Sequence, residues 1–188
     1  MNRSDFPAAR HSVEYDEIMD LKDVSFLVVD DKKFMCDLVR GMLKAFGARK
    51  VHSMIDVQDI PKYLDQQRID VLILDWVMPG TGGAAILRDL RLASNPMATT
   101  PCIVLTGYAN RSCIDRAVDG GADMILLKPL SAKMLYTRIC NLIESNRQYI
   151  QVGDYLGPVT KAHHNMLDTV DDGIIENNTG AEYWLVQP

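Results

Sequence analysis

Polar residues able to handle a phosphoryl group follow four aliphatic runs of the sequence, each where a run ends. The runs end at positions 29, 74, 105 and 127. The residues that directly follow them are, in the same order, Asp30 and Asp31, Asp75, Thr106 and Gly107, and Lys128 and Pro129. Continuous aliphatic runs are typical of fully buried parallel strands. In an open α/β sheet the carboxyl ends of such strands line one crevice, which is where ligands bind. We therefore expect three carboxylates, a hydroxyl and an amine to meet at one point, a set that suits Mg²⁺ and a phosphoryl group.

The elements that must position these residues follow from the hydrophobic spacing. Strand and helix alternate five times between positions 24 and 145, which predicts an α/β fold with a parallel sheet and right-handed crossovers. We expect a second strand at 49–52, and helices that end at Gly47, open at Asp56, span 83–92, begin near Ser112 and begin after Ser131. The helix after Ser131 is expected to bury Leu135, Ile139, Leu142 and Ile143.

The segments outside this region have a different character. Residues 1–22 carry mixed charge without sustained periodicity and are expected to form an arm, while residues 23–146 form the α/β domain. Residues 147–188 are expected to be a C-terminal extension, in which Ile174-Ile175 and Tyr183-Trp-Leu-Val186 could pair as a short hairpin. The aromatic end either packs back on the domain or supplies a strand to a partner or second copy.

Composition argues against several classes of protein. The net charge is −5 and the sequence pI is about 5.3, which gives no electrostatic footprint for nucleic acid or an anionic membrane. No apolar run approaches the length of a membrane span, and the first residues lack the apolar region of a signal peptide. The four cysteines show no paired spacing and fall in apolar segments, so we expect reduced core residues and a cytoplasmic location.

The order of these motifs resembles the receiver domain of two-component response regulators, of the stand-alone, chemotaxis-regulator-like type. The resemblance covers about residues 24–145 and rests on the order Asp-Asp, Asp, Thr, Lys at successive strand ends. The stretch Asp75-Trp-Val-Met-Pro-Gly-Thr-Gly-Gly83 is similar to the phosphoacceptor loop of that family. The resemblance implies a flavodoxin-like (βα)5 doubly wound sheet with strand order 2-1-3-4-5, and a cis peptide between Lys128 and Pro129.

The resemblance also implies a role for each polar residue. Asp75 would accept the phosphoryl group as the nucleophile, forming an aspartyl phosphate. Mg²⁺ would be held by Asp30, Asp31, Asp75 and the backbone carbonyl of Val77. Around the phosphoryl group, Lys128 would pair with one oxygen, Thr106 would donate its hydroxyl to another, and Gly107 would leave room.

Two positions depart from the family pattern and bear on the switch. Many receivers carry an aromatic residue three positions before the lysine, but this chain has Ile125 there. Aromatic coupling in that form is therefore absent or relocated. Tyr108 is a candidate replacement or a gate over the site, and the plainer alternative is a partly exposed loop tyrosine.

These features predict a single-domain response regulator in phosphorelay signalling. We expect no enzyme activity beyond self-catalysed phosphorylation and dephosphorylation. The implied partners are a sensor histidine kinase or histidine phosphotransfer protein and a downstream protein, with a homodimer possible and neither nucleic acid nor membrane involved. One alternative is a scaffold that acts without phosphorylation. The other is an aspartyl-phosphate phosphohydrolase, which usually needs a second aspartate where this chain has Val77.

Overall fold

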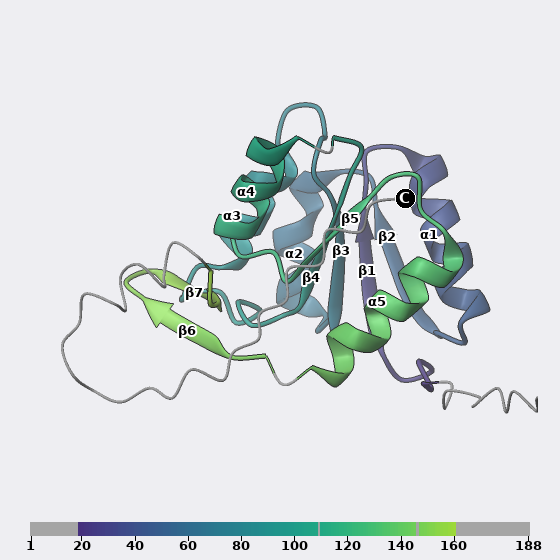
Figure 1. Cartoon of the computed structure of the whole chain (residues 1–188). Coiled ribbons are helices and arrows are strands. Elements are labelled where there is room, and N and C mark those ends of the chain that lie inside the picture. The colour runs from purple at the N-terminus through teal and green to yellow at the C-terminus, as the bar shows by residue number, and fades with distance from the viewer. Residues whose placement is uncertain (1–18, 109, 146, 161–188) are drawn as a thin grey trace, which may run out of the picture.

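A five-stranded parallel sheet forms the centre of the computed structural model, which describes residues 19–108, 110–145 and 147–160 (Figure 1). The strand order is β2-β1-β3-β4-β5, and every neighbouring pair is parallel. The strands are β1 Ser25–Val29, β2 Lys50–Met54, β3 Val71–Asp75, β4 Cys102–Thr106 and β5 Met124–Leu127. This is the flavodoxin-like order that the family resemblance implied, so the fold prediction is confirmed.

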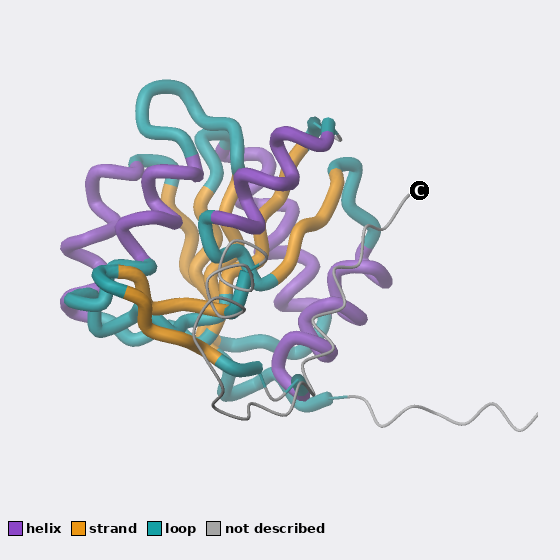
Figure 2. Tube along the Cα trace, turned by 60° about the vertical axis from the view of Figure 1, so that its left-hand side comes forward, coloured by secondary structure: helices purple, strands orange, loops and turns teal. Residues whose placement is uncertain are grey.

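Helices cover both faces of the sheet. The helices α1 Lys33–Ala45 and α5 Ala132–Glu144 lie on one face (Figure 1). The opposite face carries α2 Ile60–Gln66, α3 Gly83–Leu90 and α4 Arg111–Asp119, with the short 3-10 turn Val57–Asp59 before α2. Figure 2 shows the strands enclosed between these helices from a second direction. None of the helices in the described ranges is long and apolar enough to cross a membrane.

The strands alternate their side chains between two hydrophobic cores. Leu27, Leu72 and Val104 pack with α2, α3 and α4, whereas Phe26, Ile73 and Ile103 pack with α1 and α5. Both sets are 0–1 % exposed, which is why the strands read as unbroken aliphatic runs instead of alternating with polar residues. Leu21, ahead of β1, is also fully buried and joins the core beneath α1 and α5.

The helix starts depend on local capping. Ser131 caps α5 as expected, because its hydroxyl accepts a hydrogen bond from Met134 N at 3.2 Å. The helix α4 starts at Arg111, one residue before the expected start near Ser112. Asn110 is the N-cap, and its side chain accepts from Cys113 N at 2.8 Å.

Four further expectations need correction. The second strand, predicted at 49–52, spans Lys50–Met54 and so ends two residues later. The helix α3 ends at Leu90 and not at position 92. Asp56 caps the 3-10 turn by accepting from Gln58 N, and the α-helix itself starts only at Ile60. Ile143, expected on the buried face of α5, is 39 % exposed because it lies toward the amino-terminal edge of the sheet, beyond the packed core.

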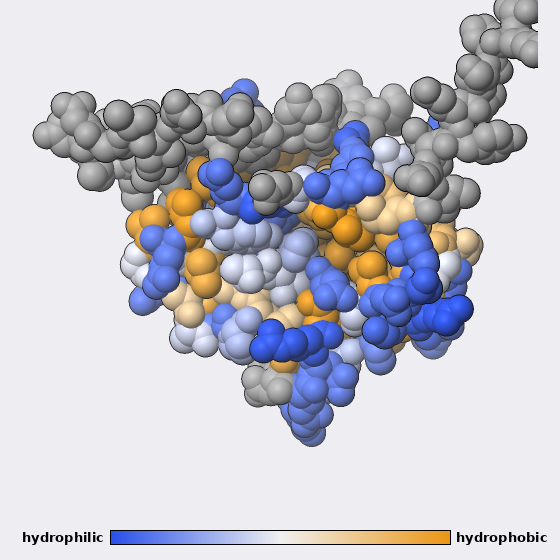
Figure 3. Space-filling model, turned by 90° about the horizontal axis from the view of Figure 1, so that it is seen from below, coloured by the Kyte–Doolittle hydropathy of each residue, from blue (hydrophilic) through white to orange (hydrophobic). Residues whose placement is uncertain are grey.

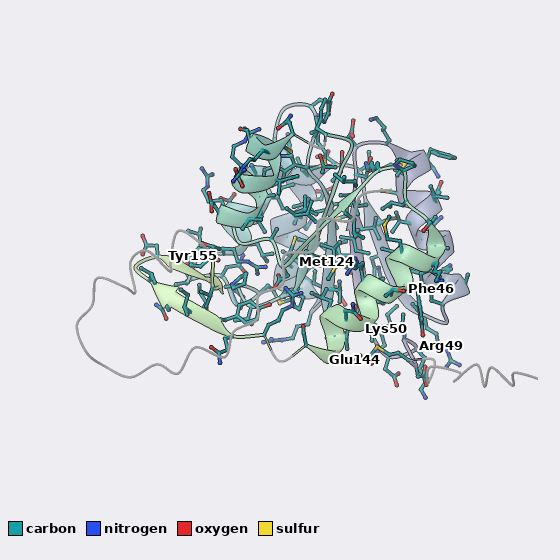
Figure 4. The ribbon with its side chains drawn as sticks, viewed as in Figure 1. Phe46, Arg49, Lys50, Met124, Glu144 and Tyr155 are labelled. Atoms are coloured by element: carbon teal, nitrogen blue, oxygen red, sulfur yellow. The ribbon has the colours of Figure 1, made fainter. Side chains whose placement is uncertain are left out.

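A second, two-stranded sheet was not predicted. The strands β6 Tyr149–Val152 and β7 Tyr155–Pro158 pair as an antiparallel hairpin across Gly153, whose φ is 57°. Gly-Asp between two short apolar runs is a hairpin signal that the sequence did contain. The hairpin lies beside the ends of α3 and α4, where Figure 4 labels Tyr155 (Figures 1 and 4). The hairpin expected between 174 and 186 lies outside the described residues.

The hairpin is joined to the sheet through a buried charge cluster. Arg91, at the end of α3, is 1 % exposed, and its Nη2 lies 2.7 Å from Asp123 Oδ2. The guanidinium also donates to three backbone carbonyls, those of Ala98, Thr100 and Gly121.

Asp123 is shared with the segment that leads into the hairpin. Its Oδ1 accepts from Tyr149 Oη at 3.0 Å and from Arg147 Nη1 at 3.3 Å. The Tyr149 ring lies 5.9 Å from the Arg91 guanidinium carbon, within cation–π range. Burial, followed by the charge of Asp123, raises the pKa of Tyr149 far above its usual range, so its phenol remains a donor.

Close packing at the start of α3 positions the end of β3. A Cβ placed on Gly83 would lie 2.5 Å from the backbone oxygen of Asp75 and 2.9 Å from the Cα of Trp76. Only glycine therefore lets α3 approach the chain as it leaves β3, where Gly83 N donates to Trp76 O at 3.1 Å.

Replacing Arg91 by methionine is expected to lower the free energy of unfolding by about 3–5 kcal/mol, because it removes the nearest cation from the buried Asp123 and leaves three backbone carbonyls without their donor. Urea unfolding measures the change. The matched control is Arg88→Met on the same helix, whose partner Asp89 lies 3.2 Å away with both side chains largely exposed. We expect that control to change stability by less than about 1 kcal/mol. Equal effects would mean that the buried pair does not stabilise the fold.

Replacing Gly83 by alanine is expected to lower the free energy of unfolding by about 1–3 kcal/mol, because the added methyl group meets backbone atoms that cannot turn away. Gly82→Ala is the control, since a Cβ there would meet its nearest atom, Trp76 O, at an ordinary 3.8 Å. Paired urea titrations in Trp184→Phe protein, read by the fluorescence of Trp76, separate the two variants. Similar losses in both would indicate that α3 shifts freely relative to β3.

Candidate functional site

The carboxyl edge of the sheet brings together side chains from three strands. Asp30 follows β1, Asp75 ends β3, and Lys128 follows β5. The Nζ atom of Lys128 lies 2.8 Å from Asp30 Oδ2 and 2.8 Å from Asp75 Oδ1. The peptide between Lys128 and Pro129 is cis, as expected. One ammonium group thus bridges two carboxylates that are 1 % and 3 % exposed.

Asp31 completes an acidic cluster with the geometry of a cation site. Ligand oxygens of Asp30, Asp31 and Asp75 all lie within 4.8 Å of one another. Asp31 Oδ1 is buried and has no hydrogen-bond partner among the described residues. A hard divalent cation would coordinate this unpaired oxygen together with the carboxylates of Asp30 and Asp75, so the donor set fits Mg²⁺. Val77, whose carbonyl was the fourth predicted ligand, follows in the loop after β3.

Burial and charge act in opposite directions on the ionisable groups. Burial raises the pKa of Asp75 above its usual range, and the neighbouring charges of Asp30 and Asp31 add to this, while Lys128 opposes it. Burial by itself would lower the pKa of Lys128, but its hydrogen bonds to Asp30 and Asp75 outweigh that effect and raise it. The lysine is therefore held as a cation between the two carboxylates.

The hydroxyl of Thr106 is held by groups on the side of α4. It accepts a hydrogen bond from Tyr108 N at 3.1 Å and lies 3.7 Å from Cys113 Sγ. Both Thr106 and Cys113 are buried, at 1 % and 4 % exposure. Cys113 was read from the sequence only as a small core residue. Cys113 is three residues after Asn110, the N-cap of α4, and lies on the buried face of that helix. This spacing is the sequence feature that could have placed it beside Thr106.

The other residues predicted for the site differ in how far they are exposed. Gly107 lies beside open space, since a Cβ there would meet nothing within 4 Å. Tyr108 is 58 % exposed, which matches the plain alternative of a loop tyrosine and also leaves it free to act as a gate. Ile125 is partly buried against the core under α2, α3 and α4, so it has the place of the missing aromatic residue without its ring.

An apolar rim around the acidic centre was not predicted as a set. Four large apolar residues that follow four different strands are strongly exposed. They are Phe34 after β1 (73 % exposed), Ile55 after β2 (47 %), Val77 after β3 (46 %) and Tyr108 after β4 (58 %). Large side chains in the loops or the first helical turn after successive strands lie at one edge of the sheet, for the same reason that the carboxylates do. We call this set the apolar rim.

Comparison with known proteins agrees with this geometry. The family model described as the response regulator receiver domain matches residues 26–140. The chemotaxis protein CheY-3 of Vibrio cholerae is 27% identical over 123 residues, which cover 65% of this chain and 94% of that protein.

Solved structures give the same result. The signal receiver domain of a DNA-binding response regulator from Colwellia psychrerythraea has a TM-score of 0.59 and 29% identity, covering 65% of this chain and 100% of that one. A response regulator from Burkholderia pseudomallei, solved with a phosphorylated aspartic acid, a calcium ion and citrate, has a TM-score of 0.53 and 25% identity, covering 66% of this chain and 68% of that one.

The family match spans more than half of the chain, and the sheet order and the clustered Asp30, Asp31, Asp75 and Lys128 agree with it. The chain therefore belongs to the response regulator receiver family.

Proposed function

We propose that this chain accepts a phosphoryl group on Asp75 and uses the modified site to change its binding to another protein. The observation that carries the proposal is the convergence of three carboxylates within 4.8 Å and one lysine bridging two of them at 2.8 Å. The phosphorylated aspartic acid and metal ion of the Burkholderia pseudomallei relative support it. The role is that of a signalling phosphoacceptor, with catalysis limited to its own phosphorylation and dephosphorylation.

The transfer would be an in-line displacement at phosphorus. A carboxylate oxygen of Asp75 forms the new O–P bond while the P–N bond of a phosphohistidine donor breaks, and the electron pair returns to the imidazole nitrogen. Asp30, Asp31, Asp75 and the carbonyl of Val77 would hold Mg²⁺. When bound, the ion supplies positive charge that offsets the charge on the phosphoryl oxygens.

Lys128 and Thr106 would form new contacts with the phosphoryl group. The ammonium of Lys128 would exchange its contact with the Asp75 carboxylate for one with a phosphoryl oxygen. The Thr106 hydroxyl would donate to a second oxygen, which requires it to turn from its present position beside Tyr108 N and Cys113 Sγ. Phosphorylation would thereby favour a conformation in which the loop after β4 has moved.

The apolar rim suggests how the phosphoryl donor is bound. Exposed Phe34, in the first turn of α1, and exposed Tyr108, in the loop after β4, offer apolar area to a protein surface. A histidine kinase or histidine phosphotransfer protein that packs on the rim would exclude water from the reacting atoms. The target of the phosphorylated form is proposed to be a second protein.

The central test uses Trp76, which follows Asp75 and is 6 % exposed. In Trp184→Phe protein, Mg²⁺ followed by beryllofluoride, an acyl-phosphate mimic, is expected to give a saturable change in Trp76 fluorescence. Asp75→Asn should abolish the beryllofluoride response, whereas Asp70→Asn, an exposed carboxylate that accepts from Ser25 N before β3, should retain it. Acetyl phosphate should add one phosphoryl mass to the unsubstituted protein and none to Asp75→Asn.

Other outcomes would select the alternatives. Mg²⁺ binding without a beryllofluoride response or a mass increase would favour a scaffold that is never phosphorylated. Turnover of a generic phosphomonoester would favour a phosphohydrolase.

A second prediction concerns competition between Lys128 and the metal. Lys128→Met removes the cation that bridges Asp30 and Asp75, so the metal-free variant should be less stable and Mg²⁺ should bind it more tightly. A tenfold gain in affinity would enlarge the rise in Tm on adding Mg²⁺ by about 3–6 °C relative to unsubstituted protein.

Thermal unfolding with and without Mg²⁺ measures this difference. The control is Lys133→Met, an exposed lysine of α5, which should leave the Mg²⁺ increment unchanged. An equal increment in Lys128→Met and unsubstituted protein would mean that the lysine and the ion do not compete for the same carboxylates.

A further inference from the structure

A groove lies at the amino-terminal edge of the sheet, opposite the acidic centre. We call it the basal groove; it has a volume of about 440 Å³, and its apolar lining is Val24, Val71, Pro101, Leu142, Ile143 and Tyr149. Figure 3 looks at this face from below and shows apolar surface near its middle with hydrophilic residues around it. A volume of this size is within the range of ligand-binding clefts, about 300–1,000 Å³.

The groove has a buried floor and an exposed apolar side. Val71 at the start of β3 and Leu142 in the last turns of α5 are 1 % and 2 % exposed. Ile143 beside them is 39 % exposed, although the helical pattern marks it as a core residue. Because Ile143 adjoins this buried apolar floor, the two together offer a continuous apolar surface to a further segment.

The wall next to the hairpin is held in place by the buried charge cluster. Arg147 Nη1 donates to the backbone oxygen of Asp123 at 2.6 Å, and Tyr149 Oη donates to Asp123 Oδ1 at 3.0 Å. Both lining residues are therefore fixed to the start of β5. A groove whose wall is already ordered needs little reorganisation when it binds a segment.

The chain itself leads away from this wall. Pro158 pairs with Tyr149, which lines the groove, and the described residues end two positions later at Thr160. Beyond it, outside the described residues, the sequence contains one run of four large apolar residues, Tyr183-Trp-Leu-Val186. The intervening residues 161–182 span up to about 70 Å when extended, so the run can reach any part of the groove.

The chemistry of the run fits that of the groove. A tryptophan side chain buries about 150–250 Å² and has one polar atom, an N–H that only donates. The apolar lining suits the ring, and the exposed Asp70 and Thr99 on the groove offer oxygen acceptors for the N–H. We propose that the basal groove binds residues 183–186 of the same chain, with Trp184 as the anchoring side chain. This goes beyond the proposed phosphoacceptor function and does not depend on it.

The test uses the full chain labelled with 5-fluorotryptophan, in which ¹⁹F NMR resolves Trp76 and Trp184. A synthetic peptide of residues 178–188 supplies the position of a solvated Trp184 resonance. In the labelled protein the Trp184 resonance should lie away from that position. Ile143→Asp, which places a charge in the groove, should return it to the peptide position.

Two internal controls keep the result interpretable. Leu92→Asp alters a residue that is also 39 % exposed but does not line the groove, so it should leave Trp184 unshifted. The Trp76 resonance should be unchanged in both variants, which verifies that the domain is folded whether or not Asp75 is ever phosphorylated.

Three outcomes would overturn the proposal. The first is a Trp184 resonance at the peptide position in the unsubstituted protein. The second is a shift that persists in Ile143→Asp. The third is a shift that disappears on dilution, which would make the occupant a second copy of the chain.

Discussion

The bridging of Asp30 and Asp75 by one lysine is the interaction on which the functional edge depends. Carboxylates that are 1 % and 3 % exposed lose most of their hydration and repel each other, which is costly without a compensating cation. The strand order places β1 beside β3, so the two carboxylates are neighbours. Lys128 follows β5, two strands or about 10 Å from β3, a distance that its long side chain spans.

A second buried cation stabilises the opposite edge, and the contrast between the two is informative. Arg91 satisfies three backbone carbonyls and Asp123, and Asp123 in turn accepts from Tyr149 and Arg147. Every group in that cluster has a partner, so it has a structural role. At the carboxyl edge Asp31 has a buried oxygen that finds no hydrogen-bond partner in the described part of the chain, which leaves that cluster able to bind an ion.

The two edges therefore present different groups within one small domain. The carboxyl edge combines acidic ligands, a cation and the apolar rim, which suits a reaction with another protein. The amino-terminal edge combines the hairpin, the buried Arg91–Asp123 pair and the basal groove, which suits attachment of the rest of the same chain. Because the sheet separates them, substitutions at one edge can be used as controls for the other.

Much of the architecture could be predicted because its signals are local. Aliphatic runs identify four of the five strands, Ser131 caps α5, and Gly47 ends α1 with a φ of 94°. The motif order then placed the acidic residues at one edge by a general rule for parallel sheets. The turn at Gly153 is also a local signal, whereas the predicted hairpin involved the later asparagine-rich turn.

What the sequence by itself determined is the type and order of the elements and the residues at the strand ends. Only the tertiary structure decided which atoms meet: Lys128 with two carboxylates, Cys113 beneath Thr106, and Arg91 buried against Asp123. It also left Ile143 open, although its spacing resembles that of its buried neighbours. The physical reason is that periodicity records which face of an element is apolar, whereas burial and pairing depend on what distant parts of the chain place against that face.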